Sequence, residues 1–275
     1  MPDPGTTTPA APASPALAPA PTENAPGRLY ERFNVHQRIQ HAILAFSFTG
    51  LIVTGWPLKF PEVGFSRLFA TVLGGPGSVG ICHRTLAVLL ILASLYHVGY
   101  LAYMFLRGQR SLEIMPGFTD AKEALGDITY FFGLRKERPR FGRYNWIEKF
   151  EYFAVAWGTL VMVITGLIIW APTYAALHLP NWAINASVII HDYEAILAGL
   201  AIFLWHFYWV HLHPDVYPMS TVWLHGLLSE QDMAHHHPRE LERLQRRAQA
   251  KGGAAGPEQP APAAAEAPSE EDSAT

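Results

Sequence analysis

The stretch that decides the fold is His191-Asp-Tyr-Glu-Ala-Ile-Leu-Ala-Gly-Leu-Ala-Ile-Phe-Leu-Trp-His206. It belongs to an apolar segment that is long enough to cross a bilayer as a helix. At about 100° per residue, fifteen steps leave the two histidines roughly 60° apart around the axis, so both can face one bundle interior. At 1.5 Å per residue they lie roughly 22 Å apart along the axis, one near each membrane surface.

A second apolar segment carries a matching pair. His83 and His97 are fourteen residues apart, which places them about 40° apart on one helix face. Two spanning helices with histidines at two matching depths offer what two stacked haems need. Cys82 is the single cysteine and no Cys-x-x-Cys-His sequence occurs, so c-type attachment is excluded and side-chain ligation alone must hold a haem.

Composition also favours a membrane protein. Half of the residues are hydrophobic and 16% are charged, which is too apolar for an ordinary soluble domain. The net charge of −3 gives no reason to expect a nucleic-acid partner. We therefore predict an all-α membrane protein, a four-transmembrane-helix bundle in which Pro57 ends the first helix. The predicted helices cover residues of about 35–56, 81–106, 148–171 and 186–212.

The rest of the chain divides around this bundle. We expect residues 28–235 to form the spanning domain and residues 236–250 to form a polar helix on the inner side. The flanking segments 1–27 and 251–275 are rich in alanine and proline and read as disordered tails. The first tail lacks the basic and apolar regions of a secretory signal.

The distribution of basic residues predicts the orientation. Seventeen of the twenty Lys and Arg residues lie before or at the start of the first helix, after the fourth, or in the stretch from Arg107 to Lys149 between the second and third. Cytoplasmic loops of membrane proteins carry such an excess. We therefore expect both termini on the cytoplasmic side, in the inner membrane of a bacterium.

This topology assigns a depth to each histidine. His83 and His191 lie near the outer face, whereas His41, His97 and His206 lie near the inner face. A hydrogen bond between helices explains one intramembrane histidine, but five histidines at two matched depths favour haem ligation.

Two other groups of histidines are not expected to bind a haem. His36 lies about 140° around the helix from His41, so both cannot face one cofactor. The run His235-His236-His237 is a conceivable metal site, but no partner ligands cluster with it in the sequence, so we predict none there.

Three motifs carry a family resemblance. Arg38-Ile-Gln-His41, with Gly55 fourteen residues later, resembles the first helix of the membrane cytochrome b subunit, the gamma subunit, of formate dehydrogenases. Gly142-Arg-Tyr-Asn145 and Thr165-Gly-Leu-Ile-Ile-Trp-Ala-Pro172 are similar to the motifs that open and close its third helix. The same superfamily includes the cytochromes b of nickel–iron hydrogenases and thiosulfate reductases. The resemblance covers about residues 32–240.

The resemblance implies two b haems in a four-helix bundle. Carried over to this chain, His83 and His191 would ligate the outer haem, and His41 and His206 the inner one. Two features depart from the family: the fifteen-residue spacing in the fourth helix, where fourteen is expected, and the extra His97. A fourteen/fifteen pattern is instead similar to the quinol-oxidising cytochrome b of b6f-type complexes, which would pair His97 with His206. We favour His41 and keep His97 as the alternate inner ligand.

A quinone site is expected beside the inner haem. Arg143, Tyr144, Asn145 and Glu148 offer donors to a quinone carbonyl and a carboxylate that could relay a proton. The resemblance implies a quinone site at this position as well. A basic interfacial anchor made by Arg143 and Lys149 is the simpler alternative.

The predicted function is that of a dihaem b-type cytochrome subunit in a membrane oxidoreductase. It would carry electrons between a partner on the periplasmic side, an iron–sulfur or multihaem cytochrome c subunit, and membrane quinone, as a quinone reductase or quinol oxidase. Two histidines per iron leave no position for substrate. The alternatives are a b6-like quinol-oxidising core, a haem-free membrane anchor, and a transporter with a histidine proton relay.

Overall fold

The computed structural model describes residues 28–108 and 111–252, and four of the helices within them are long and apolar enough to cross a membrane. The all-α, four-helix membrane fold is thereby confirmed. The predicted tail 1–27 lies outside the described residues, as does the other tail from residue 253. The four spans are α1 (Val35–Lys59), α3 (Pro76–Leu106), α5 (Trp146–Trp170), and α7 (Asn181–Leu200) with its continuation through η2 (Ala201–His206) and η3 (Tyr208–Leu212).

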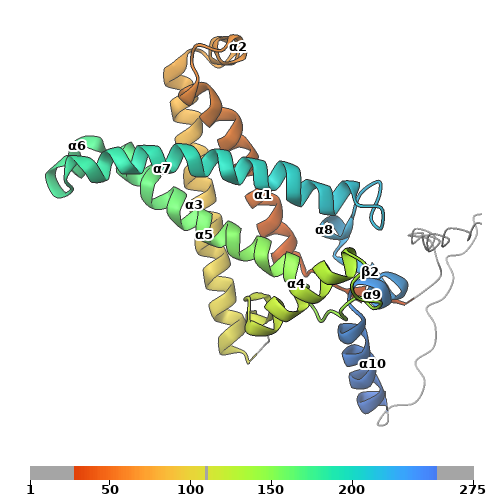
Figure 1. Ribbon diagram of the computed structural model, residues 1–275. Helices are drawn as coiled ribbons and strands as arrows, with labels where there is room; N and C mark the ends of the chain where they lie inside the picture. The colour runs from red at the N-terminus through yellow and green to blue at the C-terminus, as the bar shows by residue number, and fades with distance from the viewer. Residues whose placement is uncertain (1–27, 109–110, 253–275) are drawn as a thin grey trace, which may run out of the picture.

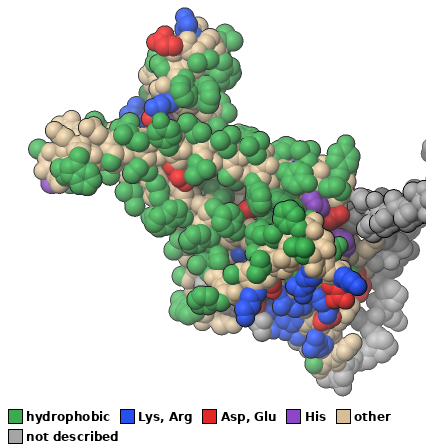
Figure 2. Space-filling model, in the orientation of Figure 1, with side chains coloured by type: hydrophobic (Ala, Val, Ile, Leu, Met, Phe, Trp, Pro, Cys, Tyr) green, Lys and Arg blue, Asp and Glu red, His purple; other side chains and the backbone are tan. Residues whose placement is uncertain are grey.

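The spans pack as two antiparallel pairs that cross one another, with α1 along α3 and α5 along α7 (Figure 1). Their outer faces carry large apolar side chains such as Phe46, Leu95 and Leu204, which are 66%, 64% and 69% exposed. Such exposure suits contact with lipid, and Figure 2 shows hydrophobic side chains along these helices. The buried positions carry small polar residues, which allow close helix packing in membranes. They include Ser47, Thr54, Thr165 and Ser187.

The prediction that Pro57 ends the first helix is wrong. Pro57 lies inside α1, which continues to Lys59, and Phe60 closes it with an N–H···O=C bond of 2.8 Å to Trp56. A proline so close to the helix end removes one hydrogen bond without disturbing a long remainder. The next span, α3, begins with a proline: Pro76 occupies its first turn, where the missing N–H is not needed.

The last span widens into π-helix where it carries His206. In η2 the N–H of Phe207 bonds to the carbonyl of Ile202, five residues earlier, and His213 bonds in the same way to Tyr208. A π turn holds one residue more than an α turn. The fifteen-residue spacing from His191 to His206 therefore behaves like the fourteen-residue spacing of a regular α-helix, which explains the departure from the family pattern.

The two ends of the bundle differ in character (Figure 1). We call the two ends that carry α2 (Gly64–Val72) and α6 (Pro172–His178), which lie apart at the top and left of Figure 1, the far end, and the opposite end the sheet end. At the sheet end, β1 (Leu29–Glu31) pairs antiparallel with β2 (Leu227–Ser229). This pairing places both ends of the spanning domain on the same side. The remaining elements of the sheet end are η1 (Ser111–Ile114), α4 (Phe118–Phe131), α8 (Val222–His225), α9 (Glu230–His236) and α10 (Pro238–Gly252).

Helix α10 corresponds to the polar helix expected at 236–250, but it extends to Gly252, two residues into the predicted tail. A separate short helix, α9, precedes it. Arg243 of α10 forms an ion pair of 2.8 Å with Glu113, and Arg239 pairs with Glu123 of α4. Lys and Arg side chains gather on this end in Figure 2. The sheet end is therefore a polar cap held together by ion pairs.

Candidate haem-binding site

Two histidines, His83 of α3 and His191 of α7, define a site near the far end. Nδ1 of His83 lies 2.9 Å from the hydroxyl of Thr54 in α1, and Nδ1 of His191 lies 3.0 Å from the hydroxyl of Thr165 in α5. In each pair of packed helices, a threonine of one helix thus positions a histidine of the other.

The threonines also fix which ring nitrogen carries the proton. The Thr54 hydroxyl donates to the Gly50 carbonyl at 2.7 Å, and the Thr165 hydroxyl donates to the Val161 carbonyl at 2.8 Å. Because each hydroxyl has a single proton, it can only accept from the histidine. Nδ1 therefore carries the proton in both rings, and Nε2 keeps the lone pair that a metal needs.

A glycine follows each of these threonines and gives the histidine room. A Cβ atom at Gly55 would lie 3.3 Å from Cε1 of His83, and one at Gly166 would lie 3.2 Å from Cε1 of His191. Both distances are shorter than ordinary van der Waals contact. The Thr-Gly pair is thus used twice, once in α1 and once in α5, to seat an imidazole from the neighbouring helix.

The second pair lies toward the sheet end. The ring centroids of His41 in α1 and His206 in η2 are 6.4 Å apart. Two imidazoles on opposite sides of one metal, with metal–nitrogen bonds of about 2 Å, have centroids separated by about 6 Å. Nδ1 of His206 lies 3.0 Å from Oε2 of Glu151, so a carboxylate directs this ring. The residues present therefore fit a bis-histidine haem iron.

His97, the alternate inner ligand, is engaged at both nitrogens. Its Nδ1 donates to Oε1 of Gln40 at 2.8 Å, and its Nε2 lies 3.0 Å from the hydroxyl of Tyr152. A histidine in this state has no free lone pair for a metal. The Nε2 amide of Gln40 is buried and lacks a partner within the described residues, so a donor beside His41 remains available to a bound group.

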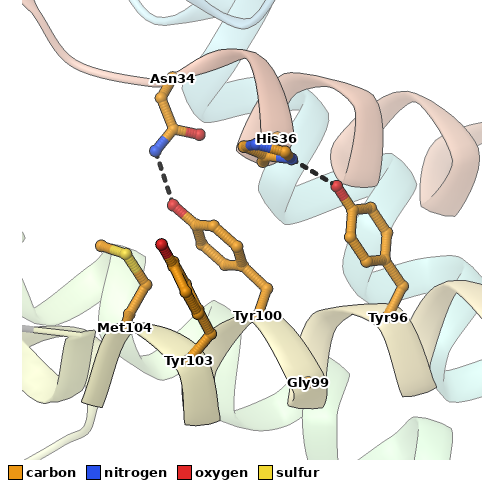
Figure 3. A pocket seen from close by; sticks show the side chains of 7 residues that line it. All are labelled: Asn34, His36, Tyr96, Gly99, Tyr100, Tyr103 and Met104. Atoms are coloured by element: carbon orange, nitrogen blue, oxygen red, sulfur yellow. Dashed lines mark hydrogen bonds between the residues drawn. The ribbon is translucent and has the colours of Figure 1, made fainter. Parts of the chain in front are cut away.

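His36 contacts α3, whereas His41 faces His206 of the last span. Nδ1 of His36 lies 2.6 Å from the hydroxyl of Tyr96, at the edge of a surface pocket of about 620 Å³ between α1 and α3. Figure 3 shows Asn34 at the same pocket, donating to the Tyr100 hydroxyl at 2.6 Å. The pocket is lined by Asn34, His36, Tyr96, Gly99, Tyr100, Tyr103 and Met104.

The four residues expected to bind quinone gather where α5 begins. Asn145 caps α5 by accepting from the N–H of Glu148 at 2.8 Å, and Glu148 accepts from the N–H of Asn145 at 2.9 Å. Glu148 also pairs with Arg32 at 3.2 Å. Arg143 donates to the Arg32 carbonyl at 2.9 Å, and its guanidinium lies over the Tyr144 ring. Many of their polar groups are therefore used to hold the helix start together.

His237 joins this cluster from the sequence-distant end of the chain. Its Nδ1 donates to the Gly142 carbonyl at 2.9 Å, and its Nε2 lies 3.8 Å from Oε1 of Glu148. Burial first, and the Arg32 charge second, lower the pKa of His237 to about 4. The ring is neutral at pH 7 and presents an unprotonated nitrogen toward the carboxylate.

Several residues of the site were not predicted from the sequence. Thr54, Thr165, Glu151 and Gln40 act through the histidines that they contact. The repeated Thr-Gly pair is the one signal that could have revealed two of them. Nothing in the sequence alone connects Glu151 with His206, because 55 residues separate them.

Comparison with known proteins finds both a family and individual relatives. The family model described as prokaryotic cytochrome b561 matches residues 32–224. The cytochrome b556(fdo) subunit of formate dehydrogenase from Escherichia coli K12 is 23% identical over 211 residues, which cover 76% of this chain and 90% of that protein. The cytochrome b556(Fdn) subunit of the nitrate-inducible formate dehydrogenase of the same strain is 23% identical over 221 residues, 78% of this chain and 93% of that protein.

Proposed function

This chain belongs to the prokaryotic cytochrome b561 family, and from that premise we propose that it is a dihaem electron-transfer subunit of a membrane oxidoreductase. The family makes it a membrane cytochrome of the b type. The count of two haems is our inference from the two histidine pairs at two depths. Bound haem b supplies reversible one-electron oxidation and reduction of its iron.

The observation that carries the proposal is the state of the ring nitrogens. His83 and His191 each donate Nδ1–H to a threonine and keep Nε2 free, which suits the outer iron. His41 and His206 face each other at a separation that suits the inner iron. His97 has neither nitrogen free, which favours His41 over the b6-like alternative. In this assignment His97 and Gln40 hydrogen-bond near the inner haem.

We infer the sidedness from charge. Seventeen of the twenty basic residues lie before α1 or in its first turn, after the last span, or in the stretch from Arg107 to Lys149. All of these segments belong to the sheet end, so the sheet end faces the cytoplasm and the far end faces the periplasm. His83 and His191 then lie near the periplasmic face.

The quinone site of the proposal lies at the start of α5, beside the inner haem. Arg143, Tyr144 and Asn145 provide polar groups for a quinone carbonyl. Glu148 and the neutral His237 form a carboxylate–imidazole pair that can pass a proton to or from the cytoplasm. Electrons can pass between the two faces in either direction, so the same path supports quinone reduction and quinol oxidation.

The partner of the proposal docks at the far end. Two of the relatives are named as subunits of formate dehydrogenases, so a dehydrogenase with an iron–sulfur or multihaem cytochrome c subunit is the class of partner that we infer. The short helices α2 and α6 form the far end and offer exposed apolar residues, including Leu68 and Leu177. Both are within reach of a subunit in the periplasm.

Haem counting tests the ligand assignment. The purified protein should give a b-type alpha band in the reduced-minus-oxidised spectrum and two haems per chain. His41→Ala should lose the inner haem alone, and His97→Ala should keep both. Absence of the band would refute the cytochrome and leave a membrane anchor or a transporter. Loss of the inner haem with His97→Ala, and not with His41→Ala, would favour the b6-like core.

Quinone turnover tests the second site. Asn145→Leu and Glu148→Leu should slow electron exchange with a soluble quinone at least tenfold while both haems stay bound. Tyr100→Phe is the matched control, because it removes one hydroxyl from the separate pocket of Figure 3. Slowing by Tyr100→Phe with unchanged turnover in the other two variants would move the site to that pocket.

A further inference from the structure

A second cluster of potential metal ligands lies at the sheet end, apart from the histidine pairs. One ligand atom from each of Asp215, His235 and His236 lies within 4.8 Å of the other two. Asp215 belongs to the turn that follows η3, and the histidines occupy the last turn of α9. The expectation that no partner ligand joins these histidines is therefore wrong, since the fold brings in a carboxylate from twenty residues earlier.

One distance within the cluster already suits a small cation. Nε2 of His235 lies 3.3 Å from Oδ2 of Asp215. Tetrahedral ligands with bonds of about 2.0–2.1 Å to zinc are separated by about 3.3 Å, so this pair already has the required spacing. His213 supports the arrangement, because its Nδ1 accepts from the Asp215 N–H at 3.3 Å and so orders the turn.

The chemistry of the three ligands selects the kind of ion. Two imidazoles and one carboxylate suit zinc and similar transition metals, whereas calcium and magnesium prefer oxygen ligands alone. The His235 side chain is exposed and the other two are half-buried, so an ion can reach the cluster from water. We propose that Asp215, His235 and His236 form a binding site for a divalent ion of the zinc class, with water completing the coordination.

Such an ion would join two parts of the sheet end. Asp215 follows the span that carries His206, and His236 precedes His237, which is bonded to the loop before α5. The metal would thus connect the end of the last span to the start of α5 through α9. The proposal stands on these ligands and does not depend on haem or quinone binding.

Equilibrium dialysis of the full-length protein against Zn²⁺ tests the site. The protein should be purified in detergent through an affinity tag that contains no histidine and stripped with a chelator. We expect one tightly bound zinc per chain. Asp215→Asn and His235→Ala should each weaken zinc binding about 100-fold, since even residues that only orient a metal ligand contribute 10–100-fold. His178→Ala, on α6 at the far end, removes one histidine elsewhere and should bind as wild type.

Folding of each variant is checked by circular dichroism and size-exclusion chromatography. His235 is exposed, so its alanine variant keeps the test valid if Asp215→Asn fails to fold. Equal zinc binding by wild type, Asp215→Asn and His235→Ala would overturn the proposal. So would a wild-type protein that takes up no stoichiometric zinc.

Discussion

Replacing Thr54 with valine should raise the reduction potential of the haem that we assign to His83. Valine keeps the shape of the side chain and removes the acceptor for the His83 Nδ1–H, now 2.9 Å away. That hydrogen bond makes the imidazole a stronger electron donor, which stabilises oxidised iron more than reduced iron. A hydrogen bond contributes about 0.5–1.5 kcal/mol, which corresponds to about 20–60 mV for one electron.

The same change should weaken haem binding. Leaving the buried N–H without a partner costs about 1–3 kcal/mol, or roughly a 5- to 150-fold loss of affinity. Potentiometric titration followed at the alpha band measures the potential, and pyridine haemochrome assay measures retained haem. Thr85→Val is the control, because Thr85 is exposed on α3 and bonds to the Ile81 carbonyl of its own helix.

If Thr54→Val leaves both the potential and the haem content unchanged, Nδ1 of His83 is not held by that hydroxyl. A shift confined to the inner haem would contradict the assignment of His83 to the outer one. Thr165→Val repeats the test at His191, where the bond is 3.0 Å, and should shift the same haem.

Two further predictions concern other residues. Glu151→Gln should raise the reduction potential of the haem assigned to His206 by about 60–130 mV, because a hydrogen bond to a charged acceptor contributes about 1.5–3 kcal/mol. An unchanged potential of the inner haem in the same titration would argue against the contact between Glu151 and His206. Gly226→Ala should lower the free energy of unfolding by about 2 kcal/mol or more. Gly226 has a φ of +81°, and a Cβ atom there would lie 2.2 Å from the Phe33 carbonyl oxygen. Gly64→Ala, with open space around it, is the control in thermal denaturation, and equal melting of the two variants would refute the clash.

The fold was predictable because bilayer thickness and helix rise leave few solutions for four long apolar segments. The helix ends were less predictable. Pro57 is a helix terminator in most contexts, but the bilayer favours a continued helix, since free backbone groups find no water there. In the sequence, the π-helical turns near His206 show only as one extra residue in the spacing from His191 to His206.

The spacing of the histidines predicts which of them share a depth, whereas the surroundings of each ring could not be predicted. Which nitrogen of His83 is free depends on Thr54, and the state of His97 depends on Gln40 and Tyr152 in two other helices. Such contacts depend on how the helices pack side by side. Asp215 joins His235 for the same reason, because a turn and a short helix meet only after the bundle has formed.

The short strand before the first span, Leu29–Glu31, pairs with the strand after the last span, Leu227–Ser229, so the spanning domain begins and ends at the same place. A domain whose first and last segments are adjacent can be joined there and opened elsewhere. The glycine-containing bend at Gly74 and Gly75, between α2 and α3, is a natural place for the opening. A circularly permuted protein would then keep the α1–α3 and α5–α7 pairs intact while presenting both new ends on the opposite face of the bilayer.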